Sequence, residues 1–323
     1  MSERFPLKFG SKASFIPFLT KELGYFDDEG LDVEVLNKPE IKAFEAAGGT
    51  VDALVNWCQH AAFGAVNGKP LLGVMVLHDA PGVTIMVADR VKDEITSAAD
   101  FAGRRIAEGA SRSAKGILTS YLAAKNGLQP GSYTPVMSAL DGRREAVTAG
   151  LNEGTVDVLT FMEPMTSYMK QTGLVSTLYD LSTRQATVDV LGVPMPAETL
   201  LVTPAFAEEQ PEIVQKLVNA FLRTMAYLKT SSPQEVAAKL PEKFLPDKDA
   251  AGKAVVVGNR WVTIAEDYTF HDDEIRVLIE AIKSGAYDDT ASGQARAQSR
   301  DADIDADSLY TNRFVEAALA ANS

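Results

Sequence analysis

The sequence has little material for covalent cross-links or for metal binding. Its 323 residues contain one cysteine, Cys58, and three histidines, His60, His78 and His271. One cysteine cannot form a disulfide within the chain, and the histidines are too scattered for a ligand motif such as H-x-x-x-H. We therefore expect no intrachain disulfide, no metal and no cofactor.

Positive charge is also scarce. The 31 lysine and arginine residues are outnumbered by 44 aspartate and glutamate residues, and the net charge is −13. Surfaces that bind nucleic acid or anionic lipid need clustered lysine and arginine, so we expect neither kind of partner. A binding site is local, however, and the net charge does not exclude a small anionic ligand.

Long apolar runs are missing as well. No run reaches the roughly 18–20 residues that a membrane span requires. The first residues, "MSERFPLKFG", do not combine a basic region with an apolar region, so the sequence predicts no signal peptide. We expect either a cytoplasmic protein or the mature form of an exported, periplasmic one.

The chain does contain apolar material for more than one core. Hydrophobic residues make up 46% of it, and the length fits about two domains. The stretch "GTVDALVNWCQHA" begins at Gly49, and "GTVDVLTFMEPMT" begins at Gly154. Each copy follows a short helical pattern that ends in glycine, and each leads into an apolar strand pattern. We interpret the copies as equivalent points in two similar β-α-β units.

Strands that alternate with short helices predict an α/β fold. We expect two lobes, each an open, mostly parallel sheet flanked by helices, with a ligand cleft at the carboxyl ends of the strands. Lobe 1 would comprise residues 1–86 and 199–323, and lobe 2 would comprise residues 87–198. The predicted elements include strands over 5–9, 31–36, 51–56, 156–162 and 200–203, and helices over 211–229, 233–240, 249–266, 273–285 and 307–320.

Several stretches resemble one known family. "FIPFLTKELGYFDDEGLDVEVL" is similar to the entry of type II periplasmic substrate-binding proteins, in the branch of nitrate, sulfonate and taurine binders and THI5/NMT1-like pyrimidine proteins. "DFAGRRIAEGASRSAKGILTSYLAAKNGL", "GTVDVLTFMEP" and "SLYTNRFVEAAL" fit the same family. The resemblance implies two lobes with a hinge, ligand capture between them, and delivery to the permease of an ABC transporter. We also expect a monomer.

The same resemblance leaves an enzyme open as an alternative. The family includes a desulfinase with a catalytic cysteine and a pyrimidine synthase with a cysteine-rich motif. Where the desulfinase resembles this chain, the first loop reads "GSKASF" and has no cysteine, and the cysteine-rich motif is absent. We therefore predict a binding protein without catalytic residues. A cytoplasmic desulfinase, decarboxylase or pyrimidine/thiamine-pathway enzyme is the alternative.

A candidate anion site lies in "GASRSAKG", between a predicted strand and a predicted helix. Ser111, Arg112 and Ser113 would lie at the start of the helix, where free N–H groups and the helix dipole attract anions. Arg112 could hold a carboxylate or sulfonate with two hydrogen bonds. The alternative is that a serine only caps the helix and Arg112 is solvated.

A second candidate lies in "NWCQH", at the end of the strand that follows the first tetrapeptide. Trp57 offers a face on which a planar ligand could stack, and Asn56 and Gln59 offer amide hydrogen bonds. The alternative is that Trp57 only packs against a helix.

Cys58 lies in the same stretch. It could act as a nucleophile only with a base, for which His60 or the pair His78-Asp79 could serve. A small buried cysteine is the more common arrangement. We therefore include Cys58 among the ligand-binding candidates and not as a catalytic residue.

The remaining candidates lie in two other loops. Glu163 could accept hydrogen bonds from a ligand, or pair with a cation, or simply stabilise the start of its helix. The resemblance adds Ser11 and Ser14, because the first loop contacts ligand in that family. Arg184 is a weaker candidate, and the paired arginines are read as solvated: Arg104, Arg105, Arg143 and Arg144. Together the candidates predict capture of a small organic anion, either a sulfonate or an aromatic or other organic carboxylate.

Overall fold

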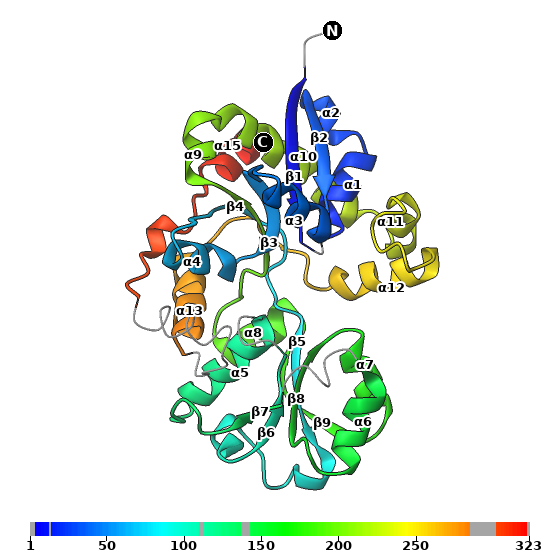
Figure 1. Cartoon of the computed structure of the whole chain (residues 1–323), viewed down its shortest axis with the longest axis vertical. Coiled ribbons are helices and arrows are strands. Elements are labelled where there is room, and N and C mark those ends of the chain that lie inside the picture. Colours follow the sequence, from blue (N-terminus) through cyan, green and yellow to red (C-terminus); the bar gives the residue numbers. More distant parts are fainter. Residues whose placement is uncertain (1–3, 13, 110–112, 137–142, 285–301, 322–323) are drawn as a thin grey trace. The chain divides into compact units, whose positions relative to one another are not determined.

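The computed structural model describes residues 4–12, 14–109, 113–136, 143–284 and 302–321 (Figure 1). The chain forms two compact units: unit 1 is Met1–Asp79, Pro196–Asp272 and Asp305–Ser323, and unit 2 is Ala80–Met195 and Asp273–Ile304. The sequence placed all of 199–323 in the first lobe, whereas the structure assigns 273–304 to unit 2. A hydrogen bond of 3.3 Å from the Tyr121 hydroxyl to Glu280 ties that segment to unit 2.

The sheet of unit 1 has the strand order β2-β1-β3-β10-β4. Strand β1 pairs in parallel with β2 and β3, whereas β10 is antiparallel to β3 and β4. All strands except β10 therefore point the same way. The strands are β1 (Phe5–Ser11), β2 (Leu31–Leu36), β3 (Ala53–Trp57), β4 (Leu72–Val76) and β10 (Glu198–Val202).

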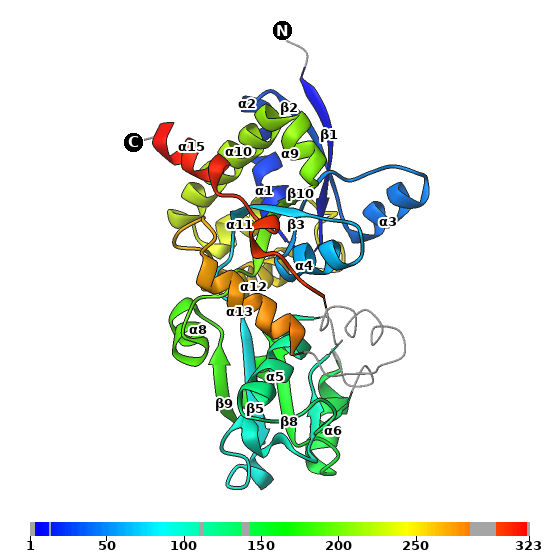
Figure 2. The ribbon, with the colours of Figure 1, turned by 90° about the vertical axis from the view of Figure 1, so that its left-hand side faces the viewer.

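Helices cover both faces of this sheet; Figure 2 shows α1 and α10 on one side of β1 and α3 on the other. The core on the α10 side contains Phe9, Phe26 and Phe221, whose ring centroids lie 6.1, 5.6 and 5.7 Å apart. The helices are α1 (Ile16–Glu22), α2 (Tyr25–Asp28), α3 (Lys38–Ala46), α4 (Gln59–Val66), α9 (Pro204–Glu209), α10 (Pro211–Lys229), α11 (Pro233–Lys239), α12 (Ala250–Trp261) and α15 (Arg313–Ala321).

The sheet of unit 2 has the order β7-β6-β8-β5-β9, and β5 is its antiparallel strand. Its strands are β5 (Val83–Ala88), β6 (Arg105–Ala107), β7 (Thr134–Pro135), β8 (Val158–Met162) and β9 (Val175–Leu181). Its helices are α5 (Ala114–Lys125), α6 (Arg144–Asn152), α7 (Met165–Gln171), α8 (Arg184–Leu191) and α13 (Asp272–Lys283). The predicted α/β class with two mostly parallel sheets is thus confirmed.

The repeated tetrapeptide occupies the same place in both units. Gly49–Asp52 precedes β3 and Gly154–Asp157 precedes β8, and each of these strands is third in the order of its sheet. In unit 2 the buried Asp157 accepts hydrogen bonds from Arg90 and Arg105. Arg105 therefore anchors the sheet, although its side chain is 43% exposed and the sequence had suggested a purely solvated role.

Most predicted elements lie within a few residues of their observed bounds, and the predicted helix over 211–229 coincides with α10. Helix α8 was missed because only Thr187 and Leu191 of its residues are buried, which leaves almost no apolar periodicity. The helix predicted over 249–266 is shorter, since α12 ends at Trp261. None of the helices that the structure describes has the length and apolarity to cross a membrane.

Candidate functional site

In unit 1, the end of β3 places four predicted residues at one edge of the sheet. Asn56 and Trp57 end the strand, and Cys58 and Gln59 lead into α4. Asn56, Cys58 and Gln59 are buried, whereas Trp57 is partly exposed. Of these four side chains, Trp57 therefore offers the most accessible surface to a ligand.

Ser11 ends β1 and Ser14 lies in the loop that follows, and both side chains are buried. The Ser11 hydroxyl donates to the Ser14 carbonyl at 2.7 Å, and the Ser14 hydroxyl accepts from the Ile16 amide at 3.3 Å. These hydrogen bonds close the turn between β1 and α1. The two serines shape this loop from within.

A cation that the sequence analysis did not single out stands over Trp57. The Arg260 guanidinium lies 5.2 Å from the centre of the Trp57 ring, a cation–π distance. Its Nη1 lies 3.4 Å from Oε1 of the buried Glu198, at the start of β10. The Arg260 side chain remains 26% exposed. A positive charge held between an aromatic ring and a carboxylate is thus accessible at this edge.

Behind Arg260, a buried histidine fixes the end of α12. His78 is 0% exposed. Its Nδ1 lies 2.8 Å from the Thr263 hydroxyl, which itself donates to the Arg260 carbonyl at 2.9 Å. The Thr263 hydroxyl therefore links the His78 ring to the backbone at the end of α12. Burial lowers the pKa of His78 to about 4, although Glu198, 3.7 Å from Nε2, acts in the opposite direction.

Cys58 is 3% exposed. Its amide donates to the Ala197 carbonyl at 2.7 Å, so its backbone belongs to the sheet edge. The ring nitrogens of His78 face Thr263 and Glu198. Reactive thiols usually sit in exposed, electropositive surroundings, so the burial of Cys58 favours a packing role.

In unit 2, the start of α5 and the end of β8 form the corresponding edge. Ser113 caps α5 by accepting from the Gly116 amide at 3.3 Å, which is the capping role that the sequence left open. Ser111 and Arg112, the other residues of the predicted anion site, lie outside the described residues. The Lys115 ammonium group lies 5.4 Å from the centre of the Phe161 ring.

A pocket of about 310 Å³ opens at this edge of unit 2. Its lining includes Lys115, Arg144 and Glu163. Arg144, read from the sequence as solvated, lies 4.7 Å from the centre of the Tyr168 ring. Two cations and one carboxylate therefore border a small cavity with aromatic walls nearby, which suits an anion.

The Glu163 carboxylate forms hydrogen bonds with the first turn of α7. Its two carboxylate oxygens accept hydrogen bonds from the Ser167 hydroxyl at 2.8 Å and the Ser167 amide at 3.1 Å. This matches the helix-start role that the sequence analysis left open. A contact between Glu163 and a ligand stays a prediction.

Each unit therefore has a cation over an aromatic ring at the carboxyl end of its third strand: Arg260 over Trp57, and Lys115 over Phe161. Sequence reasoning found Trp57 but not its cation. Glu198 could have been found from the sequence, because it is an acidic residue at the start of the apolar stretch "ETLLV". A carboxylate that is buried there needs a cationic partner. Arg260 had no comparable local signal.

Two α/β units, each with one antiparallel strand in a mostly parallel sheet, define the two-lobed fold of periplasmic binding proteins. Within that class, the chain belongs to the NMT1/THI5-like family, whose model matches residues 13–236. No curated protein matches the sequence.

Solved structures share the fold. A protein from Bordetella bronchiseptica RB50 is 21% identical with a TM-score of 0.71, covering 99% of this chain and 98% of its own. The alkanesulfonate-binding protein SsuA from Xanthomonas axonopodis pv. citri, bound to MOPS, is 16% identical with a TM-score of 0.63 and coverage of 96% and 100%. The desulfurization enzyme DSZB is also 16% identical, with a TM-score of 0.59 and coverage of 99% and 100%.

Proposed function

We propose that this chain is a solute-binding protein that captures a small organic anion for import by an ABC transporter. The observation that carries the proposal is the partly exposed side chain of Arg260, whose guanidinium lies over Trp57 and beside Glu198. The alkanesulfonate ligand class of SsuA, a structural neighbour, agrees with it. The ligand class is a sulfonate or carboxylate, with a planar or aromatic body as the preferred form.

The physical basis is preorganisation of one arginine. The guanidinium offers five N–H donors in a planar fork that matches a carboxylate or sulfonate. Glu198 and the Trp57 ring restrict its position before a ligand arrives, so little conformational entropy is lost on binding. His78 and Thr263 hold the backbone carbonyl of Arg260 from behind. An anion would therefore meet a donor group already in place.

The family membership extends the proposal to location and partner. A chain of this family that serves import would work in the periplasm and hand its ligand to a membrane permease. The net charge of −13 is compatible with a protein partner such as a permease and disfavours binding to nucleic acid.

The test begins with a thermal-shift screen of sulfonates, aromatic acids and pyrimidines, since a ligand that binds only the folded state raises Tm. Both tryptophans, Trp57 and Trp261, belong to unit 1, so a ligand at this edge should also change the intrinsic fluorescence. Calorimetry then compares wild type with Arg260→Gln. The control is Lys248→Gln, an exposed lysine just before α12. Equal affinity in all three proteins would remove Arg260 from the site and refute the proposal.

An enzyme is the second candidate, and the likeness to DSZB over nearly the whole chain is the observation that favours it. In that case Cys58 at the same edge would be the available nucleophile. Its burial weighs against this role, because the reactive form is a thiolate that must reach its substrate.

A further inference from the structure

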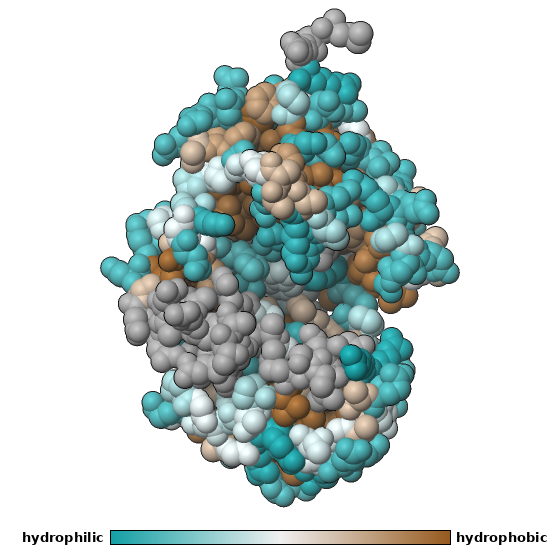
Figure 3. Space-filling model, viewed as in Figure 1, coloured by the Kyte–Doolittle hydropathy of each residue, from teal (hydrophilic) through white to brown (hydrophobic). Residues whose placement is uncertain are grey.

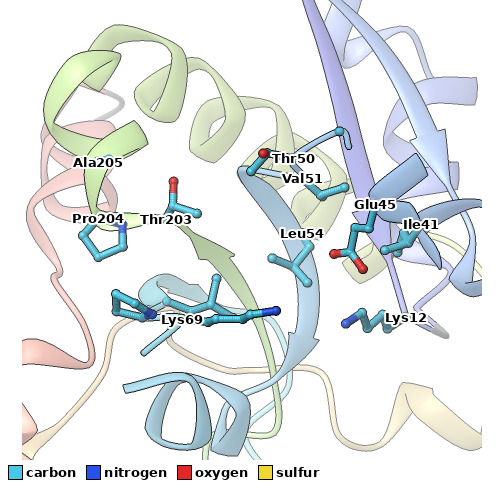
Figure 4. Close-up of a pocket in the computed structure, with 13 residues that line it drawn as sticks. Lys12, Ile41, Glu45, Thr50, Val51, Leu54, Lys69, Thr203, Pro204 and Ala205 are labelled. Carbon is cyan, nitrogen blue, oxygen red and sulfur yellow. The ribbon is translucent and has the colours of Figure 1, made fainter. Parts of the chain in front are cut away.

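Unit 1 contains a cavity whose lining includes neither Trp57 nor Arg260. Its volume is about 670 Å³, within the range typical of sites for small organic ligands. It lies over one face of the sheet, near the amino ends of β3 and β4 and the carboxyl end of β10 (Figure 4). Its lining includes Lys12, Ile41, Glu45, Val51, Leu54 and Lys69.

The floor of this cavity is apolar and closely packed. The side chains of Ile41 in α3, Val51 just before β3, and Leu54 in β3 are all buried. A Cβ atom added to Gly10 would lie 2.9 Å from the Leu54 Cβ and 3.2 Å from the Ile41 Cδ1, so α3 and β3 approach β1 closely at this point. Figure 3 shows that brown apolar atoms and teal hydrophilic atoms are interspersed over the visible surface of unit 1. The floor therefore offers a preformed apolar surface.

Two lysines enter this cavity from opposite sides. Figure 4 shows the side chains of Lys12 and Lys69 extending toward each other across the cavity, with Glu45 above Lys12. Among the described residues, neither ammonium group has a hydrogen-bond or ion-pair partner. An anion placed between the two ammonium groups would be attracted to both, and the apolar floor would screen that attraction less than water does.

We propose that this cavity is a second ligand site, which binds an organic anion with an apolar body, such as a medium-chain carboxylate or sulfonate. The acid group lies between Lys12 and Lys69, and the hydrocarbon part lies on Val51 and Leu54. The site shares no residue with the Trp57–Arg260 edge, so it stands independently of the proposed import function.

The experiment uses octanoate and octane-1-sulfonate as probes on the whole chain labelled at Ile, Leu and Val methyl groups. Both probes, titrated below the concentration at which they form micelles, should shift the methyl resonances of Ile41, Val51 and Leu54 in a saturable way. Octan-1-ol, which has the same chain without the charge, should bind more weakly. No saturable shift at these methyls would overturn the proposal.

Charge variants decide whether the lysines take part. Lys12→Gln and Lys69→Gln should each raise the Kd of octanoate about tenfold or more, as expected when a hydrogen bond to a charged group is lost. Lys42→Gln, an exposed position of α3 that does not line the cavity, is the matched control and should leave Kd unchanged. Unchanged affinity in both test variants would also overturn the proposal.

Arg260→Gln separates this site from the proposed one. It should leave the octanoate shifts at Ile41, Val51 and Leu54 intact, even where it abolishes binding of the ligand found by the thermal screen. If Arg260→Gln removed the shifts at these methyls, the cavity would not be an independent site. Failure of the import proposal would leave this result unaffected, so the two can fail separately.

Discussion

The two copies of Gly-Thr-Val-Asp precede equivalent strands but end in differently bound aspartates. Asp52 in unit 1 accepts one hydrogen bond of 3.2 Å from the Thr203 hydroxyl and is partly exposed. Asp157 in unit 2 is buried and binds Arg90 and Arg105, with an additional hydrogen bond of 2.9 Å from the Arg105 amide. Burial alone would raise the pKa of Asp157, but these hydrogen bonds outweigh it and lower the pKa.

This difference shows that a short repeat can preserve a backbone position without preserving an interaction. In both units the tetrapeptide immediately precedes the third strand, because glycine follows the preceding helix and Val begins the apolar run. The partner of each aspartate comes from another segment of its unit: Thr203 follows β10, and Arg105 begins β6. The same holds at the carboxyl ends of these strands, where arginine stands over tryptophan in unit 1 and lysine over phenylalanine in unit 2.

The largest expected effect separates the two units by their response to acid. The folded-state pKa of His78 is about 4, against 6.5 when unperturbed, so the unfolded chain takes up the proton first as pH falls. The stability that neutral His78 contributes is complete above pH 6.5 and is lost down to about pH 4. We expect a loss of about 3 kcal/mol for unit 1 over this window.

Urea titrations at a series of pH values, followed by tryptophan fluorescence, measure this effect because both tryptophans belong to unit 1. Asp157 has a lowered pKa, so its contribution is present above its unfolded value of 3.8 and is lost only as pH falls further through the folded value. The variant His78→Gln should flatten the fluorescence profile between pH 6.5 and 4. A profile that keeps its slope in this variant would contradict the assignment to His78.

The second prediction compares the two aspartates directly. Asp157→Ala should lower the free energy of unfolding by about 2–3 kcal/mol, because it leaves two arginines without their shared buried partner. Asp52→Ala should cost less than about 1 kcal/mol, the range for one neutral donor at a partly exposed site. Urea denaturation followed by circular dichroism reports both units, and fluorescence reports unit 1. Equal losses in the two variants would break the comparison.

The third prediction compares the cations at the two edges. Once the thermal screen has supplied a ligand, Arg260→Gln should weaken its binding by about 1.5–3 kcal/mol, the range for a hydrogen bond to a charged group. Lys115→Gln should cost about 1 kcal/mol, since lysine is a point charge on a flexible stem. Calorimetry measures both, with exposed Lys170→Gln as the control in unit 2. A larger effect at Lys115 would reverse the ranking of the edges.

The smallest expected effect concerns Cys58. If the protein only binds its ligand, Cys58→Ser should change Kd by a few-fold at most, because a hydroxyl of similar size replaces a buried thiol. Neither wild type nor variant should then release a product from the ligand. Affinity is measured by calorimetry, and product by chromatography after prolonged incubation. Product from the wild type but not from Cys58→Ser would establish the enzyme candidate instead.

Much of the fold could be predicted because its signals are local. Apolar residues at three- and four-residue steps predicted α10, and alternation predicted β2 within its observed bounds. Of the site, the sequence placed Trp57 at a strand end, and the structure confirms that position. Neighbouring Asn56 and Gln59 proved to be buried, which no local pattern revealed.

The cationic residues of the two candidate sites could not be predicted from local patterns. Arg144 looked solvated because charged pairs on helices usually are, yet it lines the pocket of unit 2. Arg260 lay inside a predicted helix with no motif around it. Its role depends on Glu198 and Trp57, which come from other segments of unit 1.

The sequence by itself determined the α/β class, the order of most strands and helices, and the two equivalent strand entries. Short-range periodicity and glycine positions specify these features, since neighbours along the chain share one backbone path. Only the tertiary structure decided that Arg260 stands over Trp57 and that Lys12 and Lys69 enter one cavity. These contacts join segments far apart in the chain, and they form because sheet pairing and core packing, rather than local pattern, bring those segments together.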